Sequence, residues 1–245
     1  MELDIVRMIF ADDFDQKNFV VDKTGAKVLE VIGTCITLCP SVSDTENVIF
    51  GEPNFEYIER ELEWYKSQSL FVRDIPGKVP AIWEAVADKD GKINSNYGYL
   101  IWSAENHHQY GNVLEELRKN PFSRRAIMIY TRPIMHYDYN RNGMSDFVCT
   151  NTVQYLIRGG RLTAVVNMRS NDAIFGFRND YHWQLHVLNK LAADLDVPVG
   201  QIIWQTGSLH VYERHFYLVD HYAETGELNI SKEKYRELYP DSEYA

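Results

Sequence analysis

Cys149 carries the most reactive side chain in a part of the sequence that is rich in functional groups. It stands at the head of an apolar run, residues 148–157, and Arg169 begins a second polar motif downstream. A thiol becomes a nucleophile when it ionises, and nearby positive charge favours the thiolate. The alternative is a buried, inert cysteine, which is the commoner state of an intracellular cysteine. The residues around Cys149 must decide between these two interpretations.

Glu61 is a candidate acid–base group on a helix predicted over residues 53–67. Ile58, Leu62 and Tyr65 are spaced at i, i+4 and i+7, so they form one apolar face, and Glu61 lies on that face. A carboxyl held at a cleft by such a face has a raised pKa, as general acid–base catalysis requires. The alternative is a carboxylate at the edge of the face that reaches solvent.

The composition is that of an ordinary globular protein, and we expect one catalytic domain over residues 1–245. The chain has 45% hydrophobic and 24% charged residues, enough for a core without disulfides or metals. Its three cysteines give no disulfide framework and no zinc-ligand spacing. The N-terminus lacks a secretory signal, and no apolar run approaches the roughly 20 residues of a membrane helix. We expect a cytoplasmic protein with no metal and no membrane partner.

The net charge of −10 argues against a broad nucleic-acid surface, which needs clustered positive charge. A small anionic substrate remains compatible with this charge, because a few arginines can reverse its sign locally. Arg124, Arg125 and Arg169 are the candidates for such a site.

Hydrophobic periodicity and turn residues predict alternating helices and strands. A short helix or arm is expected in residues 1–20, further helices over 53–67, 80–87, 113–120 and around 183–195, and strands over 28–38, 126–130, 148–157, 162–168, 202–204 and 209–212. Gly159 and Gly160 make residues 148–168 a hairpin candidate. The polar tail after Thr225 predicts a surface helix and a loose end. The absence of repeats and linkers favours one α/β domain.

Several motifs, taken together, resemble the thymidylate synthase family, and most closely its phage deoxycytidylate hydroxymethylases. They occur in order from about residue 22 to residue 221 and comprise Arg60-Glu61-Leu62-Glu63-Trp64-Tyr65, Ala81-Ile82-Trp83-Glu84, Asn96-Tyr97-Gly98, Ser123-Arg124-Arg125, Cys149, Met168-Arg169-Ser170-Asn171-Asp172, Phe175-Gly176-Phe177-Arg178-Asn179-Asp180 and Ser208-Leu209-His210-Val211-Tyr212. Each motif alone is weak evidence for the family, but all of them in this order make a chance similarity very unlikely.

The resemblance implies a mixed, mostly antiparallel sheet packed by helices, with a sheet face that forms a homodimer interface. It also implies one-carbon chemistry at carbon 5 of a pyrimidine nucleotide, with 5,10-methylenetetrahydrofolate as cosubstrate. Cys149 matches the nucleophile that adds to carbon 6 and makes carbon 5 enamine-like. Glu61 matches the glutamate that organises water and moves protons around the base.

The resemblance also assigns binding roles. Arg169 and Ser170 match phosphate ligands, and Arg169 would lower the pKa of the thiol. Arg124 and Arg125 match a pair that reaches the phosphate bound by the neighbouring subunit, with ordinary surface charge as the alternative. Lys23 stands where the family commonly has an arginine, and a solvated lysine is its alternative.

Further matches concern the sugar, the base and the folate. His210 and Tyr212 match residues that hydrogen-bond the sugar hydroxyl, and Tyr97 matches a tyrosine near the cysteine. Trp83 matches a folate-contacting tryptophan and Asp172 an aspartate that orients the pterin. For Trp83 and Tyr97, simple core packing is the alternative.

Asp180 departs from the synthases that act on deoxyuridylate, which carry an asparagine there. A carboxylate accepts a hydrogen bond from the 4-amino group of cytosine, whereas an amide suits the uracil edge. An unpaired polar edge costs about 1–3 kcal/mol, so this exchange favours deoxycytidylate by roughly one to two decades. If the match to the family were shifted by one residue, Asn179 would stand at the position of the synthase asparagine. The motif Phe175-Gly176 fixes the match so that Asp180 stands there.

Two more departures favour hydroxymethylation over methylation. Met168 replaces the usual glutamine, and the chain ends at Tyr244-Ala245 without the apolar tail that synthases fold over folate. Water would then reach the exocyclic methylene, with Glu61 as the group that activates it. We therefore expect a deoxycytidylate 5-hydroxymethyltransferase, in the host cytoplasm if phage-encoded, in contact with other nucleotide-synthesis enzymes.

Two alternatives stay open. One is a synthase-like methylase of dUMP or dCMP. The other is a non-catalytic homologue, such as a scaffold in a nucleotide-synthesis complex or an RNA-binding regulator, against which the intact set of reactive residues and the acidic charge argue.

Overall fold

The computed structural model describes residues 2–22, 25–40 and 47–245. Its helices are α1 (Leu3–Asp15), α2 (Phe55–Ser67), α3 (Ala81–Val86), α4 (Tyr97–Trp102), α5 (Gln109–Lys119), α6 (Met135–Asp138), α7 (Phe175–Leu195), α8 (Phe216–Thr225) and α9 (Lys232–Leu238). Its strands are β1 (Val20–Val21), β2 (Lys27–Leu38), β3 (Ile127–Ile129), β4 (Thr150–Arg158), β5 (Arg161–Asp172) and β6 (Val199–Tyr212). Lys23, an expected phosphate ligand, lies outside the described residues.

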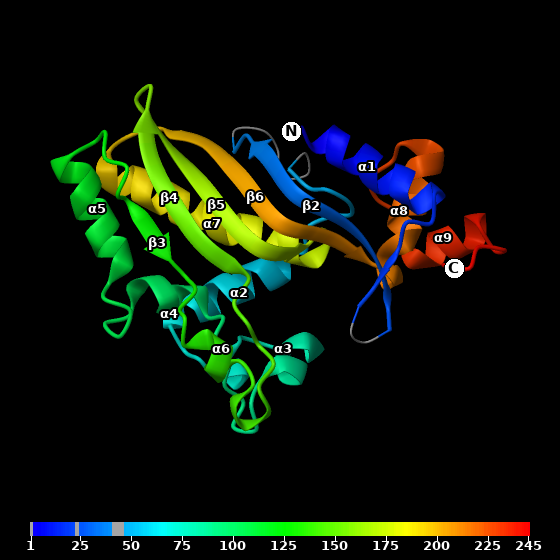
Figure 1. The fold of residues 1–245 in the computed structure, drawn as a ribbon, viewed down its shortest axis with the longest axis horizontal. Helices are drawn as coiled ribbons and strands as arrows, with labels where there is room; N and C mark the ends of the chain where they lie inside the picture. The colour runs from blue at the N-terminus through cyan, green and yellow to red at the C-terminus, as the bar shows by residue number, and fades with distance from the viewer. Residues whose placement is uncertain (1, 23–24, 41–46) are drawn as a thin grey trace. The chain divides into compact units, whose positions relative to one another are not determined.

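The strands form a sheet in the order β1-β2-β6-β5-β4-β3 (Figure 1). β2 pairs antiparallel with β6 from Val28 opposite Tyr212 to Leu38 opposite Ile202. β1 with β2 and β3 with β4 are antiparallel as well. The expected α/β fold, with a largely antiparallel sheet and helices packed on it, is confirmed. None of the described helices combines the length and the apolar character that crossing a membrane requires.

The chain divides into two compact units made of interleaved segments. The first comprises Met1–Pro53, Met168–His182 and Gln201–Ala245, and the second comprises Asn54–Asn167 and Trp183–Gly200. The single catalytic domain expected over residues 1–245 stays a prediction.

The first unit has an aromatic core between helices at the two ends of the sequence. α1 lies beside α8 and β2 (Figure 1), and the Phe14 ring meets Phe216 edge-on at a centroid distance of 5.7 Å. The Tyr244 ring joins them, 5.2 Å from Phe14 and 5.5 Å from Phe216. The expectation of a loose end after Thr225 is therefore wrong, because one aromatic side chain anchors the polar tail.

The second unit is built on the contact between α2 and α4. Asn96 caps α4 by accepting from the Tyr99 amide at 2.8 Å, and its side-chain nitrogen donates to the carbonyls of Trp64 and Ser69. Gly98 allows this approach, since a Cβ there would lie 1.8 Å from the Tyr65 carbonyl oxygen. This explains the glycine in the motif Asn96-Tyr97-Gly98.

β6 corrects the sequence analysis, which predicted two separate strands. It is one strand of 14 residues, and Gly207 lies inside it. A Cβ at Gly207 would lie 2.8 Å from the Arg169 carbonyl oxygen. Gly207 therefore marks a close approach of two backbones within the sheet, which is a common reason for glycine in a strand.

Replacing Gly98 with alanine should destabilise the protein by more than about 3 kcal/mol, because the methyl group would overlap a backbone carbonyl that the α2–α4 contact fixes. Urea unfolding measures this loss. Gly111→Ala is the matched control: it lies in α5 with open space around it, so alanine should be neutral or stabilise by about 1 kcal/mol. Equal stability of the two variants would contradict the packing described for Gly98.

Candidate active site

Cys149 lies in the second unit, one residue before β4 begins. It is not part of a disulfide and is half-buried, and its Sγ lies 3.8 Å from the Phe147 carbonyl oxygen. The segment before it is anchored by Asp146, a buried carboxylate that accepts from the Asn94 amide at 2.7 Å and from the Ser95 amide at 2.8 Å. This anchor fixes the backbone that leads to the thiol, and Cys149 as a residue is partly accessible.

Glu61 is buried on α2, with 5% of its surface exposed. The Tyr57 hydroxyl donates to Glu61 Oε1 at 2.7 Å, and the Trp83 indole N–H donates to the Tyr57 oxygen at 2.7 Å. Tyr57 and Glu61 are four residues apart on one helix, the spacing at which side chains meet. A chain of two hydrogen bonds therefore runs from α3 to the carboxyl on α2.

Burial raises the pKa of Glu61 from 4.5 to about 7, although hydrogen bonds from Tyr57, Trp83 and Tyr65 act in the opposite direction. Desolvation disfavours the charged form more than these donors stabilise it. The expectation of a raised pKa is met, and the solvent-exposed alternative for Glu61 is wrong. A carboxyl that titrates near neutral pH can both accept and release a proton.

The two aromatic residues expected at the site pack differently. Tyr97 is buried, with its ring stacked on Tyr65 at 5.3 Å and edge-on to Tyr130 at 5.3 Å. Trp83 is half-buried and meets Trp64 edge-on at 5.3 Å. Core packing is thus a real role of Tyr97, whereas Trp83 keeps an accessible part and donates toward Glu61 through Tyr57.

The first unit contains Arg169, Ser170 and Asp172 on β5, and His210 and Tyr212 on β6. The rings of His210 and Tyr212 meet edge-on at 4.9 Å. Burial raises the pKa of Asp172 and lowers the pKa of His210, and the attraction between the two groups opposes both shifts. The structure thus brings together the expected sugar and pterin ligands. Cys149 belongs to the other unit, so its expected pairing with Arg169 stays a prediction.

Asp180 lies in the second turn of α7 and is hydrogen-bonded to the β5 motif. The Asn171 side-chain nitrogen donates to Asp180 Oδ2 at 2.8 Å. The sequence analysis expects Asp180 to contact the base. Its partner Asn171 stands in the sequence between the expected phosphate ligand Ser170 and the expected pterin ligand Asp172. Asn179 precedes it on α7 and is half-buried as well.

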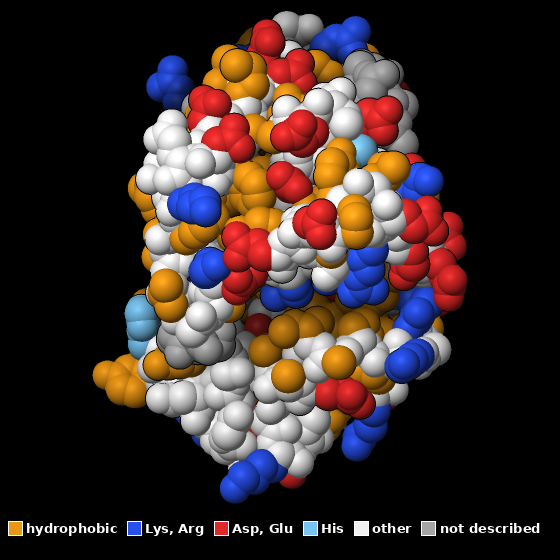
Figure 2. Space-filling view, turned by 90° about the vertical axis from the view of Figure 1, so that its right-hand side faces the viewer, with side chains coloured by type: hydrophobic (Ala, Val, Ile, Leu, Met, Phe, Trp, Pro, Cys, Tyr) orange, Lys and Arg blue, Asp and Glu red, His pale blue; other side chains and the backbone are white. Residues whose placement is uncertain are grey.

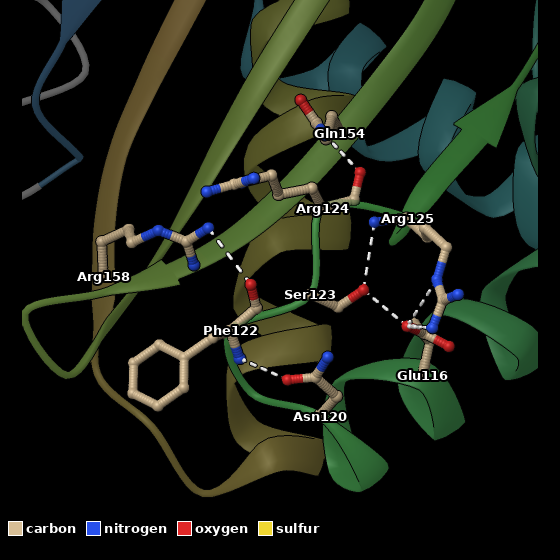
Figure 3. Close-up of polar contacts among 8 residues, drawn as sticks. All are labelled: Glu116, Asn120, Phe122, Ser123, Arg124, Arg125, Gln154 and Arg158. Carbon is tan, nitrogen blue, oxygen red and sulfur yellow. Dashed lines mark hydrogen bonds and ion pairs between the residues drawn. The ribbon is translucent and has the colours of Figure 1, made fainter.

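Arg124 and Arg125 are exposed between α5 and β3 (Figure 3). Arg125 pairs with Glu116 at 3.2 Å, and the Ser123 hydroxyl donates to the same carboxylate oxygen. These contacts, that of Ser123 first, hold the pKa of Glu116 below its usual value. Arg124 points away from Glu116, and its carbonyl accepts from Gln154 at 2.7 Å. No ion pair to Arg124 occurs among the described residues, and its expected contact with a phosphate stays a prediction.

Two general properties of the described residues bear on ligands. On the face drawn in Figure 2, acidic side chains lie among the basic ones, and no broad basic surface forms there. Within the part of the chain that the structure describes, no group of three or more His, Cys, Asp or Glu side chains could hold a metal ion.

The sequence matches the family model described as "Thymidylate synthase" over residues 3–237. The chain belongs to the thymidylate synthase family. It is 58% identical over 242 residues to the deoxycytidylate 5-hydroxymethyltransferase of Enterobacteria phage T4, and 58% identical over 243 residues to that of phage T6; both matches cover 96% of each chain. Thymidylate synthase from Bacillus subtilis subsp. natto is 30% identical over 64% of this chain and 57% of its own length.

The fold is also that of a solved family structure. Thermostable thymidylate synthase A from Bacillus subtilis superposes with a TM-score of 0.66 at 24% identity, over 83% of this chain and 73% of that one. The likeness shows that the two chains share a fold.

The sequence analysis missed three residues that contact expected site residues of this thymidylate synthase family member: Tyr57, Asn171 and Arg214. Tyr57 was detectable, because it stands four residues before Glu61 on the same helix. Arg214 lies 4.3 Å from the Tyr212 ring centre and 3.5 Å from Asp172, and with Tyr212 it lines a cavity of about 400 Å³. Nothing in the sequence singled out Arg214 or the bond from Asn171, since both depend on strand and helix placement.

The buried carboxyl predicts a pH-dependent stability. The folded protein holds the Glu61 proton up to a pKa of about 7, whereas the unfolded chain releases it near 4.5. The stability of the fold should therefore fall between these two pH values, by about 3 kcal/mol for a shift of this size. Glu61→Gln should lose this component, which urea unfolding at pH 5 and pH 8 detects.

Glu63→Gln is the control, since Glu63 is exposed on the same helix. It should show the same pH dependence as the unaltered protein. A Glu61→Gln variant that still lost stability over this range would contradict the assignment.

Proposed function

We propose that this protein is a deoxycytidylate 5-hydroxymethyltransferase that uses 5,10-methylenetetrahydrofolate. The observation that carries the proposal is its 58% identity, over 96% of both chains, to phage enzymes of that name. Asp180, hydrogen-bonded to Asn171 at 2.8 Å, supports it from the structure. A phage-encoded enzyme of this kind would act in the host cytoplasm, with other nucleotide-synthesis enzymes as its partners.

Cys149 is the nucleophile in this proposal. Its thiolate adds to carbon 6 of dCMP, and the electron pair moves to carbon 5, which attacks the methylene carbon of the folate iminium form. Loss of the carbon 5 proton and of tetrahydrofolate leaves an exocyclic methylene. Water adds to that methylene, the thiolate leaves carbon 6, and 5-hydroxymethyl-dCMP results. No hydride is transferred, so the folate product is tetrahydrofolate.

Glu61 supplies acid–base chemistry for this sequence. With a pKa of about 7, it exists in both protonation states at neutral pH. The ionised form can take a proton from water, and the protonated form can return it to the base. The Tyr57 hydroxyl holds one of its oxygens, which fixes the direction of the other.

Charged and polar residues of the first unit would bind the nucleotide. Arg169 and Ser170 take the phosphate, and the guanidinium favours the thiolate of Cys149. His210 and Tyr212 bind the sugar hydroxyl of a deoxyribonucleotide. Asp180 accepts a hydrogen bond from the 4-amino group of cytosine, which uracil cannot supply.

Trp83 and Asp172 would hold the folate. Trp83 offers the accessible part of its ring for stacking, and Asp172 offers a carboxylate that Arg214 pairs with at 3.5 Å. Tyr97 supports this region from the aromatic core.

The protein would act as a homodimer with shared sites. In the second unit, Ile127 and Ile129 expose 38% and 46% of their surface on β3, on either side of the buried Met128. An exposed apolar strand face favours burial against another surface, and a second copy satisfies it. Arg124 and Arg125 directly precede this strand, where they could reach the phosphate bound by the partner subunit.

The product of the reaction tests the proposal. Incubation with dCMP and methylenetetrahydrofolate labelled in the transferred carbon should yield labelled 5-hydroxymethyl-dCMP and tetrahydrofolate in equal amounts. Cys149→Ala should form neither product and should not release the carbon 5 hydrogen. A methylated base together with dihydrofolate would instead identify a synthase-like methylase. Absence of any turnover would favour a non-catalytic homologue.

A further inference from the structure

Three polar side chains gather on one face of the sheet where β2 pairs with β6. Ser208 and His210 are two residues apart on β6, and Glu30 lies directly opposite His210 on β2. Residues two apart on a strand point to the same face, and so do directly opposed residues of antiparallel neighbours. All three belong to the first unit. The register of the two strands therefore brings a carboxylate, a hydroxyl and an imidazole together.

Hydrogen bonds connect these three groups in series. The Ser208 hydroxyl donates to Glu30 Oε1, and its oxygen lies 3.5 Å from His210 Nδ1. Hydrogen bonds at substrate sites are often this long and tighten in the substrate complex. A serine hydroxyl has a single hydrogen, and a carboxylate can only accept. Since Glu30 takes that hydrogen, the Ser208 oxygen offers His210 only lone pairs, and the ring hydrogen must be on Nδ1.

The surroundings of His210 favour a neutral ring. Burial lowers the pKa of His210, and the charge of Arg214 acts in the same direction, whereas the charges of Asp172 and Glu30 oppose the shift. A neutral imidazole has one N–H and one lone pair on its two nitrogens. With the hydrogen on Nδ1, the lone pair is on Nε2, the ring nitrogen farther from Ser208.

We propose that Glu30 and Ser208 are positioning residues that make His210 a hydrogen-bond acceptor for the 3′-hydroxyl of the nucleotide. This inference rests on the proposed function and deepens it by assigning the direction of the hydrogen bond at the sugar. The hydroxyl donates to His210 Nε2, and its oxygen accepts from the Tyr212 hydroxyl. The site therefore takes nucleotides with a donor at the 3′ position and rejects those with only an acceptor there, such as a 3′-phosphate.

Loss of the Glu30 carboxylate would remove this direction. The Ser208 hydroxyl could then rotate and donate to Nδ1, which places the ring hydrogen of His210 on Nε2. The 3′-oxygen would face donors from both His210 and Tyr212, and its own hydrogen would lose its acceptor.

Glu30→Leu tests the proposal by steady-state turnover of dCMP and of its 3′-fluoro analogue, in which fluorine replaces the hydroxyl and cannot donate. For dCMP, kcat/KM should fall about threefold to tenfold, the size of one hydrogen bond. The change should appear mainly in KM, because the sugar hydroxyl is bound equally before and during the reaction. For the analogue, kcat/KM should stay constant or rise. An equal loss for both nucleotides would reduce Glu30 to a structural residue and overturn the inference.

Two variants of Ser208 isolate the contribution of its hydroxyl. Ser208→Ala removes the connection between Glu30 and His210 and should reproduce the loss for dCMP alone. Ser208→Thr keeps the hydroxyl, and threonine suits a strand, so turnover of dCMP should match that of the unaltered protein. A threonine variant as impaired as the alanine variant would contradict the role of the hydroxyl.

Ser69→Ala is the matched control. Ser69 lies in the second unit, and its hydroxyl donates to the carboxylate of Asp74 as that of Ser208 does to Glu30. Its replacement removes the same kind of hydrogen bond and should leave the ratio of the two kcat/KM values unchanged.

The tautomer of His210 can be measured on the unaltered protein. Nitrogen-15 NMR of the histidine-labelled protein distinguishes a protonated from an unprotonated ring nitrogen, and the His210 signals are those missing from His210→Gln. Nδ1 should carry the hydrogen at neutral pH, and Glu30→Leu should shift the population toward Nε2–H. A hydrogen on Nε2 in the unaltered protein would overturn the inference. Failure of that protein to bind or turn over dCMP would instead refute the proposed function itself.

Discussion

The burial of one carboxyl group, Glu61, is the constraint on which the second unit depends. The carboxyl is 5% exposed, Tyr57 donates to it, and Trp83 donates to Tyr57. These bonds connect α2 to α3, and Trp83 in turn packs edge-on against Trp64. The same burial raises the pKa of Glu61 to about 7. The energetic cost of enclosing the carboxyl thus produces a group that can exchange protons at neutral pH.

Three acids, Glu61 in the second unit and Asp172 and Asp180 in the first, have distinct environments and, under the proposed function, distinct tasks. Desolvation governs Glu61, which suits it to proton transfer. Asp172 is also raised in pKa by burial, but Arg214 and His210 oppose the shift and favour its charged form. Asp180 accepts from a neutral amide, Asn171. Carboxyl groups of identical chemistry are differentiated by their neighbours, a pattern that active sites commonly use to separate acid, base and binding roles.

The sequence predicted what depends on local pattern. The face of α2 with Glu61 on it, the strand from residue 28 to 38 and the α/β class follow from periodicity and are confirmed. The division of β6 was wrong, because glycine in a sequence does not reveal whether it turns the chain or, as at Gly207, admits a neighbouring backbone. The packing of Tyr244 on Phe14 and the ion pair of Arg214 with Asp172 join segments far apart in the chain, so no local pattern reports them. The order of the motifs identified Asp180 as the residue expected at the base. Its hydrogen bond to Asn171 became visible only in the folded structure.

Covalent trapping tests the central chemical claim most directly, namely that Cys149 attacks carbon 6 while carbon 5 accepts the one-carbon unit. Fluorine at carbon 5 of dCMP cannot leave as the proton does, so the reaction should stop with nucleotide and folate both attached to the enzyme. Mass spectrometry of the digested protein should find both masses on the peptide that contains Cys149. An intact protein without added mass, or an adduct on another residue, would contradict this mechanism.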